Sequence, residues 1–203
     1  MSRQSVSTIM FDLGGVLFEL SGAATICQWT RERLTPEQLL ERWLASPAVR
    51  SFESGRIDFS VFRERLREEL GLTMSDDDFA GAFAAWVTGT YPGAESLLRE
   101  LTGRYRLACF SNTNEIHWDI LERDYRVLPL FERIFASFQM GLVKPDPEAF
   151  GYVLDALDRP ADSIIFLDDS QPNVDAANAC GLRAFRVSGV DGVRRALNAL
   201  ELL

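Results

Sequence analysis

Two patterns of apolar and polar positions divide the chain. From about Ala23 to Gly89, apolar residues recur at helical spacing, and no convincing strand is predicted there. On either side of this stretch, short apolar runs alternate with helical patterns. Strands that alternate with helices predict a parallel sheet with helices on both of its faces. The predicted fold class is therefore α/β.

The predicted sheet has five strands. The first is the apolar run at 6–11, and the others follow at 106–110, 133–137, 163–167 and 183–187. Helices are predicted between the later strands and after them, at 94–101, 115–122, 147–157, 172–180 and about 192–200. The helical stretch separates the first strand from the rest. We therefore predict a Rossmann-like parallel sheet with a helical segment inserted after strand one.

The inserted segment contains three recognisable helix starts. Thr35 precedes a proline, Asp58 precedes an amphipathic run that stops at Gly71, and Ser75 precedes three acidic residues. These starts predict an α/β core formed by residues 1–20 and 91–203 and a helical cap formed by residues 21–90, lying over the strand ends. Three tryptophans are expected to pack inside the cap: Trp29, Trp43 and Trp86.

Composition and charge narrow the functional classes. The 203 residues include 30 acidic and 21 basic side chains, a net charge of −9, which argues against nonspecific nucleic-acid binding. No targeting segment is evident, and no apolar run reaches transmembrane length. Cys27, Cys109 and Cys180 are widely separated, as in proteins of a reducing compartment. We expect a cytoplasmic protein without a membrane or nucleic-acid partner; the sequence makes no prediction of oligomeric state.

Polar residues follow the strands at the positions where a parallel sheet binds ligands. Asp12 follows the first strand, and Ser111-Asn112 follows the second. Lys144 lies in the loop beyond the third, and Asp168-Asp169 follows the fourth. Since ligands bind beyond the carboxyl ends of parallel strands, we predict that these side chains share one crevice.

Together these groups fit phosphoryl transfer. Three converging carboxylates need a cation, and oxygen ligands on strand tips suit Mg²⁺. Lys144 can compensate an anion, while Ser111 and the backbone N–H groups beside Asn112 can donate to phosphate oxygens. Asp12 can then act as a nucleophile toward phosphorus. Each residue alone has a simpler interpretation: a turn for Asp12, a helix cap for Ser111-Asn112 and a solvated loop for Lys144. The combination favours a shared site.

These residues resemble the motifs of the haloacid dehalogenase (HAD) superfamily over nearly the whole chain. The stretch from Phe11 to Leu17 is similar to its first motif, Ser111-Asn112 to the second, Lys144 to the third and Asp168-Asp169 to the fourth. The subgroup that the chain resembles is the bacterial α-D-glucose-1-phosphate phosphatases. That group shares the glycine two residues after the nucleophile and a Ser-Asn-Thr-Asn run followed by a histidine.

The resemblance implies an HAD-like core and a Mg²⁺-dependent phosphatase of a small phosphorylated metabolite, such as a sugar phosphate. It implies an aspartyl-phosphate intermediate on Asp12. Mg²⁺ would be held by the Asp12 carboxylate, the backbone carbonyl of Gly14, Asp168 and Asp169. His117, the only histidine, is a candidate for substrate contact or proton relay, with local packing as the alternative.

Gly14 departs from most phosphatases of the superfamily, which place a general acid–base aspartate there. Loss of that help is worth about 10²–10⁴-fold in rate. We expect one of three compensations: a leaving group that is a poor base, a proton relay through solvent water, or another residue, with Glu19 and His117 as candidates. Arg50 and Arg56 of the predicted cap are candidate contacts to a sugar or phosphate.

Two other functions are compatible with Gly14. A metal-independent 2-haloacid dehalogenase also lacks the second aspartate, because a halide leaves without a proton. The adjacent acids Asp168-Asp169 argue against it, since that branch needs no metal and does not normally carry such a pair. The other alternative is a catalytically weakened binding or regulatory protein. The intact acidic groups argue against that alternative, because a strained and costly site usually indicates use.

Overall fold

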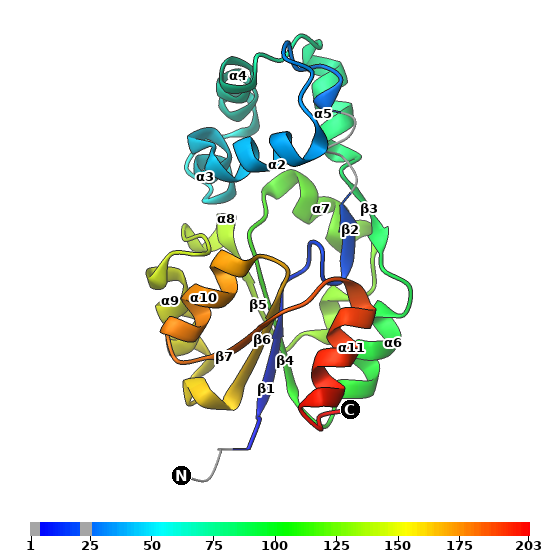
Figure 1. Ribbon diagram of the computed structural model, residues 1–203, viewed down its shortest axis with the longest axis vertical. Coiled ribbons are helices and arrows are strands. Elements are labelled where there is room, and N and C mark those ends of the chain that lie inside the picture. The colour runs from blue at the N-terminus through cyan, green and yellow to red at the C-terminus, as the bar shows by residue number, and fades with distance from the viewer. Residues whose placement is uncertain (1–4, 21–25) are drawn as a thin grey trace.

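Five parallel strands form the central sheet of the protein, in a computed structural model that describes residues 5–20 and 26–203 (Figure 1). The strand order across the sheet is β5-β4-β1-β6-β7. The strands are β1 (Thr8–Phe11), β4 (Arg106–Ser111), β5 (Arg133–Ala136), β6 (Ile164–Asp168) and β7 (Arg183–Arg186). Helices cover both faces, so the predicted Rossmann-like α/β class is confirmed.

The central strand β1 brings the ends of its neighbours together. Phe11, the last residue of β1, is paired with Cys109 of β4 on one side and with Leu167 of β6 on the other. The chain builds the sheet outward to β4 and β5 on the first side and to β6 and β7 on the second. The strand order therefore reverses at β1, and open α/β sheets form their ligand sites at such a reversal.

Alternating side chains of the strands give the sheet two apolar faces. Phe11 of β1 faces the cluster with α6 (Ala94–Leu101), α7 (Glu115–Asp124) and α11 (Gly189–Ala199), whereas Met10 faces the cluster with α9 (Pro147–Leu157) and α10 (Gln171–Ala179). A strand buried on both faces reads as a continuous apolar run, because successive side chains point to opposite sides. This is the reason that Ile9-Met10-Phe11 could be identified as a strand.

Four helices of the inserted segment lie beyond the carboxyl ends of the strands (Figure 1). They are α2 (Pro36–Ala45), α3 (Pro47–Glu53), α4 (Phe59–Leu70) and α5 (Asp76–Ala84). Thr35, Asp58 and Ser75 are N-caps whose side chains accept backbone hydrogen bonds, and Gly71 ends α4 with φ 62°. The predicted helix starts and the stop at Gly71 are thus confirmed. Left-handed backbone at a helix end favours glycine.

The inserted helices have an apolar cluster of their own. The rings of Phe52 and Phe62 stack with centroids 4.4 Å apart, and Phe83 packs on Trp43 and Trp86. Trp43 and Trp86 are buried as predicted, whereas Trp29 is 36% exposed and lies outside this cluster. An independent apolar cluster lets these helices pack together without the sheet.

An antiparallel ribbon, which the sequence did not predict, connects the two parts. It consists of β2 (Phe18–Leu20) and β3 (Val87–Thr90), so the prediction of no strand before Gly89 is wrong at its end. Strands of three and four residues are too short to show the alternation of a half-buried strand. The predicted strand at 133–137 is likewise shortened, because Ser137 begins the short helix α8 (Ser137–Met140).

Two short 3₁₀ turns, η1 (Leu128–Leu130) and η2 (Ala161–Ser163), precede β5 and β6. Within residues 5–20 and 26–203, no helix combines the length and apolar character that crossing a membrane requires.

Candidate active site

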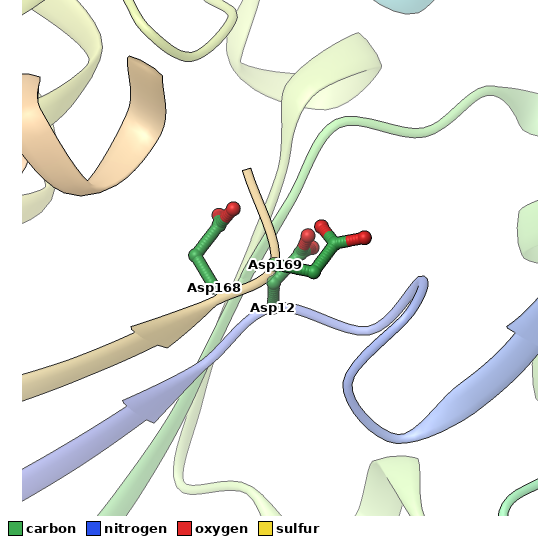
Figure 2. A group of neighbouring side chains, drawn as sticks. All are labelled: Asp12, Asp168 and Asp169. Atoms are coloured by element: carbon green, nitrogen blue, oxygen red, sulfur yellow. The ribbon is translucent and has the colours of Figure 1, made fainter. Parts of the chain in front are cut away.

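Three carboxylates meet at the carboxyl end of the sheet. Asp12 follows β1, Asp168 ends β6 and Asp169 comes next, and their side chains gather above the strand tips (Figure 2). One oxygen of each lies within 4.8 Å of the others. Asp168 is fully buried, Asp12 is 8% exposed, and Asp169 is exposed. The structure therefore brings together the three acids that were predicted to share one crevice.

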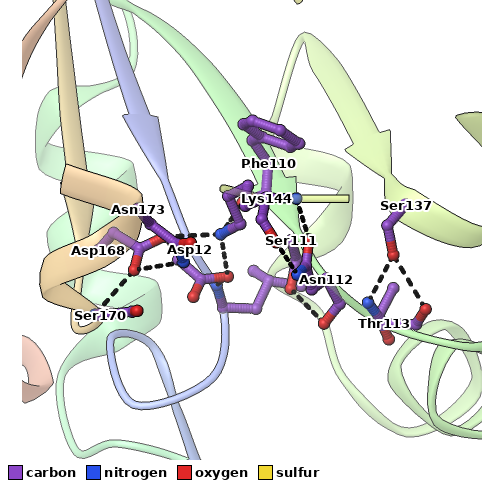
Figure 3. A network of polar contacts seen from close by, with 11 residues as sticks. Asp12, Phe110, Ser111, Asn112, Thr113, Ser137, Lys144, Asp168, Ser170 and Asn173 are labelled. Atoms are coloured by element: carbon purple, nitrogen blue, oxygen red, sulfur yellow. Dashed lines mark hydrogen bonds and ion pairs between the residues drawn. The ribbon is translucent and has the colours of Figure 1, made fainter. Parts of the chain in front are cut away.

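The Lys144 ammonium neutralises part of this acidic group. Its Nζ lies 2.7 Å from Asp168 Oδ2 and 3.2 Å from Asp12 Oδ1, and it donates to the Phe110 carbonyl at 2.9 Å (Figure 3). An ammonium has three N–H donors, so these three acceptors satisfy it completely. Lys144 is 3% exposed and is the only lysine of the chain, the other basic residues being arginines. The compact ammonium fits this enclosed position, where a planar guanidinium would need more space.

Burial makes the Asp12 carboxylate costly to ionise. It raises the pKa of Asp12 to about 7; Lys144 opposes this shift, and the charges of Asp168 and Asp169 add to it. Burial alone would lower the pKa of Lys144, but the carboxylates of Asp12 and Asp168 hold it above its usual value. Partial desolvation and the charge of Asp168 also raise the pKa of Asp169, although this residue is exposed at the surface. When all three carboxylates are ionised, the single ammonium leaves negative charge that a further cation would balance.

Asp168 is held by donors on three sides. Besides Lys144, its oxygens accept from the backbone N–H of Ser170 at 2.8 Å and from Nδ2 of Asn173 at 3.0 and 3.1 Å. Asn173 lies in the first turn of α10 and was not predicted as a site residue. Its position five residues after Asp168, at the start of the following helix, is a signal that could have identified it. Asp169 keeps its side-chain oxygens freer than Asp168 does.

The residues after β4 hold the Lys144 loop. Asn112 donates from Nδ2 to the Lys144 carbonyl and accepts the Lys144 backbone N–H at Oδ1, both at 2.9 Å. These two bonds commit the Asn112 side chain to positioning Lys144. Ser111 is 4% exposed, and its Oγ donates only a long bond of 3.4 Å to the Asn112 carbonyl. The Ser111 hydroxyl is therefore readily redirected to another acceptor.

The two glycines after Asp12 have different structural requirements. Gly15 has φ +68°, and a Cβ there would overlap Asp169 Oδ2, so the turn passes against the acidic group only as glycine. At Gly14, a Cβ would lie 2.7 Å from Leu20 Cδ1, the far end of a flexible side chain. Gly14 lies in the turn between β1 and β2, where a side chain needs only a shift of Leu20.

His117 does not contact the acidic group in this structure. Its Nε2 donates to the Phe83 carbonyl of α5 at 2.8 Å, its Nδ1 lies 3.1 Å from Asn114 Nδ2, and its ring stacks on Phe83 with centroids 4.3 Å apart. Both ring nitrogens are therefore occupied. Glu19, the other candidate for the missing acid, is exposed on β2.

The buried position of His117 leads to a prediction about pH. Burial lowers its pKa from 6.5, more than its hydrogen bond to Phe83 raises it. His117 then binds a proton more readily in the unfolded chain than in the folded protein. The contribution of the neutral His117 ring to stability is therefore lost as the pH falls below about 6.5. We expect His117→Gln to reduce the loss of unfolding free energy between pH 7.5 and pH 5.5, measured by urea denaturation. An equal or larger loss in the variant would contradict this role.

The helix α3 contacts the core beside the acidic group. The Ser137 hydroxyl donates to the Glu53 carbonyl at 2.6 Å and accepts from the Thr113 backbone N–H at 2.9 Å. Arg50 forms an ion pair with Asp146, two residues after Lys144, so its guanidinium is engaged with the core. Arg56 lines a cavity of about 280 Å³ at this junction, together with Phe52, Gly55, Ile57, Asp58, Glu115 and Phe138. Glu53 and Ser137 were not predicted as site residues, and no sequence signal marks them.

The donor set fits a hard divalent cation. The three clustered carboxylates provide only oxygen ligands, which Mg²⁺ prefers. Three carboxylates face a single ammonium, so Lys144 alone does not balance their charge. Both observations agree with the sequence-based prediction of a magnesium site.

Comparisons with known proteins match this architecture. Residues 6–181 match the model of the haloacid dehalogenase-like hydrolase family. The sesquiterpene phosphatase astK of Aspergillus oryzae is 34% identical over 85% of both chains. A D-ribitol-5-phosphate phosphatase of Bacteroides thetaiotaomicron is 19% identical over 89% of this chain and 91% of its own. A HAD family enzyme of that bacterium has been solved with magnesium and inorganic phosphate. Its structure matches this one with a TM-score of 0.74 and 25% sequence identity, over 91% of this chain and 95% of its own.

Proposed function

The chain belongs to the haloacid dehalogenase-like hydrolase family, and from this premise we propose that it is a Mg²⁺-dependent phosphatase that uses Asp12 as its nucleophile. The observation that carries the proposal is the Lys144 ammonium between Asp12 and Asp168, with Asp169 beside them at the strand tips. A dense acidic group with one buried cation is costly to fold, and such cost is typical of sites that bind a further cation and an anion.

The hydrogen bonds of Asp12 support its role as the nucleophile. Oδ1 accepts from the Leu13 backbone N–H at 2.7 Å and is paired with Lys144. Within the part of the chain that the structure describes, no donor is bonded to Oδ2. This arrangement fixes the carboxylate through one oxygen and leaves the other to attack phosphorus. A positioned carboxylate is the nucleophile of aspartyl-phosphate enzymes.

We assign the Mg²⁺ ligands to Asp12, Asp169, Asp168 and the backbone carbonyl of Gly14. Bound there, the cation would neutralise charge on the carboxylates and on the transferring phosphoryl group. Asp169 supports this assignment best, because its oxygens are freer than those of Asp168. The family enzyme from Bacteroides thetaiotaomicron that holds magnesium and phosphate gives independent support.

Phosphate binding is assigned to Lys144, Ser111 and the backbone N–H groups around Asn112. The Lys144 ammonium is charged and shielded from solvent. It can therefore stabilise negative charge at the phosphoryl oxygens with little rearrangement of the site or of water. The Asn112 side chain contributes by holding the Lys144 backbone. We retain His117 only as a residue that orders this edge of the site, since its ring is bonded away from the acids.

The proposed substrate is a small phosphate monoester, with a sugar or polyol phosphate as the first choice. The ribitol-phosphate phosphatase supports this class, and the sesquiterpene phosphatase supports an apolar alcohol as the alternative. We propose that residues 21–90 act as a cap that selects the substrate over a core of residues 1–20 and 91–203. The free thiols Cys27, Cys109 and Cys180 support a reducing, cytoplasmic location.

A panel of phosphate esters tests the proposal. We expect release of inorganic phosphate from sugar, polyol, prenyl or aryl phosphates with Mg²⁺, and loss of that release after chelation with EDTA. Activity that survives chelation would overturn the metal assignment. Chloride release from 2-chloropropionate without metal would instead establish the dehalogenase alternative. An inactive protein that still binds phosphate esters would establish the binding or regulatory alternative.

A further inference from the structure

An alkoxide leaving group needs a proton, and Gly14 has no side chain to supply one. The proposed reaction breaks the bond between phosphorus and the ester oxygen, so a nearby acid speeds it for any alcohol that is a strong base. The structure disfavours both residues considered above: Glu19 is exposed on β2, and both ring nitrogens of His117 are occupied. A side chain that supplies the proton would therefore come from another element at the mouth of the site.

Glu53 occupies such a position. It is the last residue of α3, and its backbone carbonyl accepts the Ser137 hydroxyl bond at 2.6 Å. Ser137 in turn holds Thr113, two residues after Ser111. The Arg50–Asp146 ion pair fastens the same helix to the loop that carries Lys144. Glu53 is thus fixed against the core at the two loops to which phosphate binding is assigned.

The surroundings of the Glu53 side chain suit an acid that gives up and regains a proton. The carboxyl group interacts electrostatically with both Lys144 and Asp12. Desolvation of this half-buried residue raises its pKa to about 7; Lys144 opposes the shift, and the charge of Asp12 adds to it. A general acid is most effective with a pKa near the working pH. The backbone contacts place the residue, and the charge environment agrees with that placement.

We propose that the Glu53 carboxyl group, held by α3 over the strand ends, is the general acid–base that replaces the side chain missing at Gly14. The inference rests on the proposed phosphatase function and deepens it, because it extends the substrates to esters of strongly basic alcohols.

The two steps balance with one proton on Glu53. In the first, an Asp12 oxygen forms a bond to phosphorus, the phosphorus–ester oxygen bond breaks, and Glu53 gives its proton to the departing oxygen. In the second, the Glu53 carboxylate takes a proton from water as that water attacks phosphorus. The bond from phosphorus to Asp12 breaks, inorganic phosphate leaves, and Glu53 is again protonated.

Leaving-group dependence tests the assignment. We compare Glu53→Gln with wild type on the best alkyl phosphate of the panel and on 4-nitrophenyl phosphate, whose leaving group needs no proton. The value of kcat/KM covers the steps up to phosphoryl transfer from the ester. It therefore reports on Glu53 as an acid in the first step and not on its role as a base in the second. We expect a loss of about 10²–10⁴-fold for the alkyl ester and less than about 10-fold for the aryl ester. The matched control is Glu64→Gln, an exposed glutamate of α4, which should leave both values unchanged.

A second variant restores an acid at the position of Gly14. Among residues 5–20 and 26–203, the only close neighbour of a Cβ there is Leu20, so Gly14→Asp is combined with Leu20→Ala to make room. In the Glu53→Gln background, this pair should recover at least about 10-fold of the lost alkyl-ester activity, an effect that a purely structural role of Glu53 would not produce.

The outcomes separate the two proposals. Equal losses for both esters in Glu53→Gln, or no loss for either, would overturn the role of Glu53 while leaving the phosphatase function intact. A wild type that hydrolyses only 4-nitrophenyl phosphate would also overturn it, because a working acid gives access to poor leaving groups. A wild type that hydrolyses no phosphate ester would refute the phosphatase function, and the role of Glu53 with it.

Discussion

Asp12→Asn is expected to abolish phosphate release, by a factor on the order of 10⁴–10⁶. An amide oxygen is a poor nucleophile, and no other carboxylate of the site has the place of Asp12 at the tip of the central strand. The measurement is the rate of phosphate release with saturating Mg²⁺. Asp155→Asn, an exposed change on α9, is the matched control and should be fully active. More than a tenth of the wild-type rate in Asp12→Asn would refute the nucleophile assignment.

The same substitution should not destabilise the protein. Burial and neighbouring charge raise the pKa of Asp12 to about 7 from 3.8, so ionisation of this group opposes folding. The contribution of the Asp12 carboxyl group to stability is complete at pH values below its pKa in the unfolded chain. This contribution is lost as the pH rises through its pKa in the folded protein. We expect Asp12→Asn to unfold at a higher urea concentration than wild type at pH 8 without metal, with the difference vanishing toward acid pH. Lower stability at pH 8 would contradict the charge argument and would leave the loss of activity open to a structural explanation.

Lys144→Met is expected to cost both stability and activity. The substitution keeps the length of the side chain but leaves Asp168, which is fully buried, without its charged partner at 2.7 Å. Removing one member of a buried ion pair typically costs about 3–5 kcal/mol. The measurement is urea denaturation at neutral pH without metal, followed by phosphate release with Mg²⁺. We expect turnover to fall by at least about 10²-fold, because the fixed positive charge at the phosphoryl group is lost.

An exposed ion pair provides the control for Lys144. Arg194 of α11 lies 3.0 Å from Glu100, with both side chains more than a third exposed. Surface pairs contribute about 0–1 kcal/mol, so Arg194→Met should have little effect on the urea midpoint and none on turnover. Similar effects of the two substitutions on the urea midpoint would contradict the prediction. They would show that the buried Lys144 ion pairs contribute no more to the free energy of unfolding than an exposed pair does.

The sheet could be predicted because its strands are buried on both faces. Ile9-Met10-Phe11 and Ile164–Leu167 read as uninterrupted apolar runs, and the polar residues that follow them lie at one edge of a parallel sheet by topology alone. The helix boundaries at Thr35, Asp58 and Ser75 could be predicted because each cap bonds to its own first turn. These features depend on local sequence or on a simple rule of sheet topology.

What the sequence did not reveal depends on contacts between distant segments. The Glu53 carbonyl and the Ser137 hydroxyl are 84 positions apart, and no local pattern predicts that they meet. The hydrogen bond from the Asn112 side chain to the Lys144 carbonyl likewise joins residues 32 positions apart, and no local pattern predicts it. His117 has a helix position suited to the crevice, but the Phe83 carbonyl of the inserted helices binds its ring nitrogen. The packing of the insert on the core therefore decides which predicted residues point into the site.

The burial of Lys144 also has a consequence for chemical labelling. Because it is the only lysine and is 3% exposed, the folded chain presents no accessible side-chain amine to an amine-directed reagent. Modification of a lysine in this protein is therefore an event at one known position, and it requires the crevice to open. The rate of that modification measures how often the Lys144 ammonium is exposed to solvent, without an introduced probe.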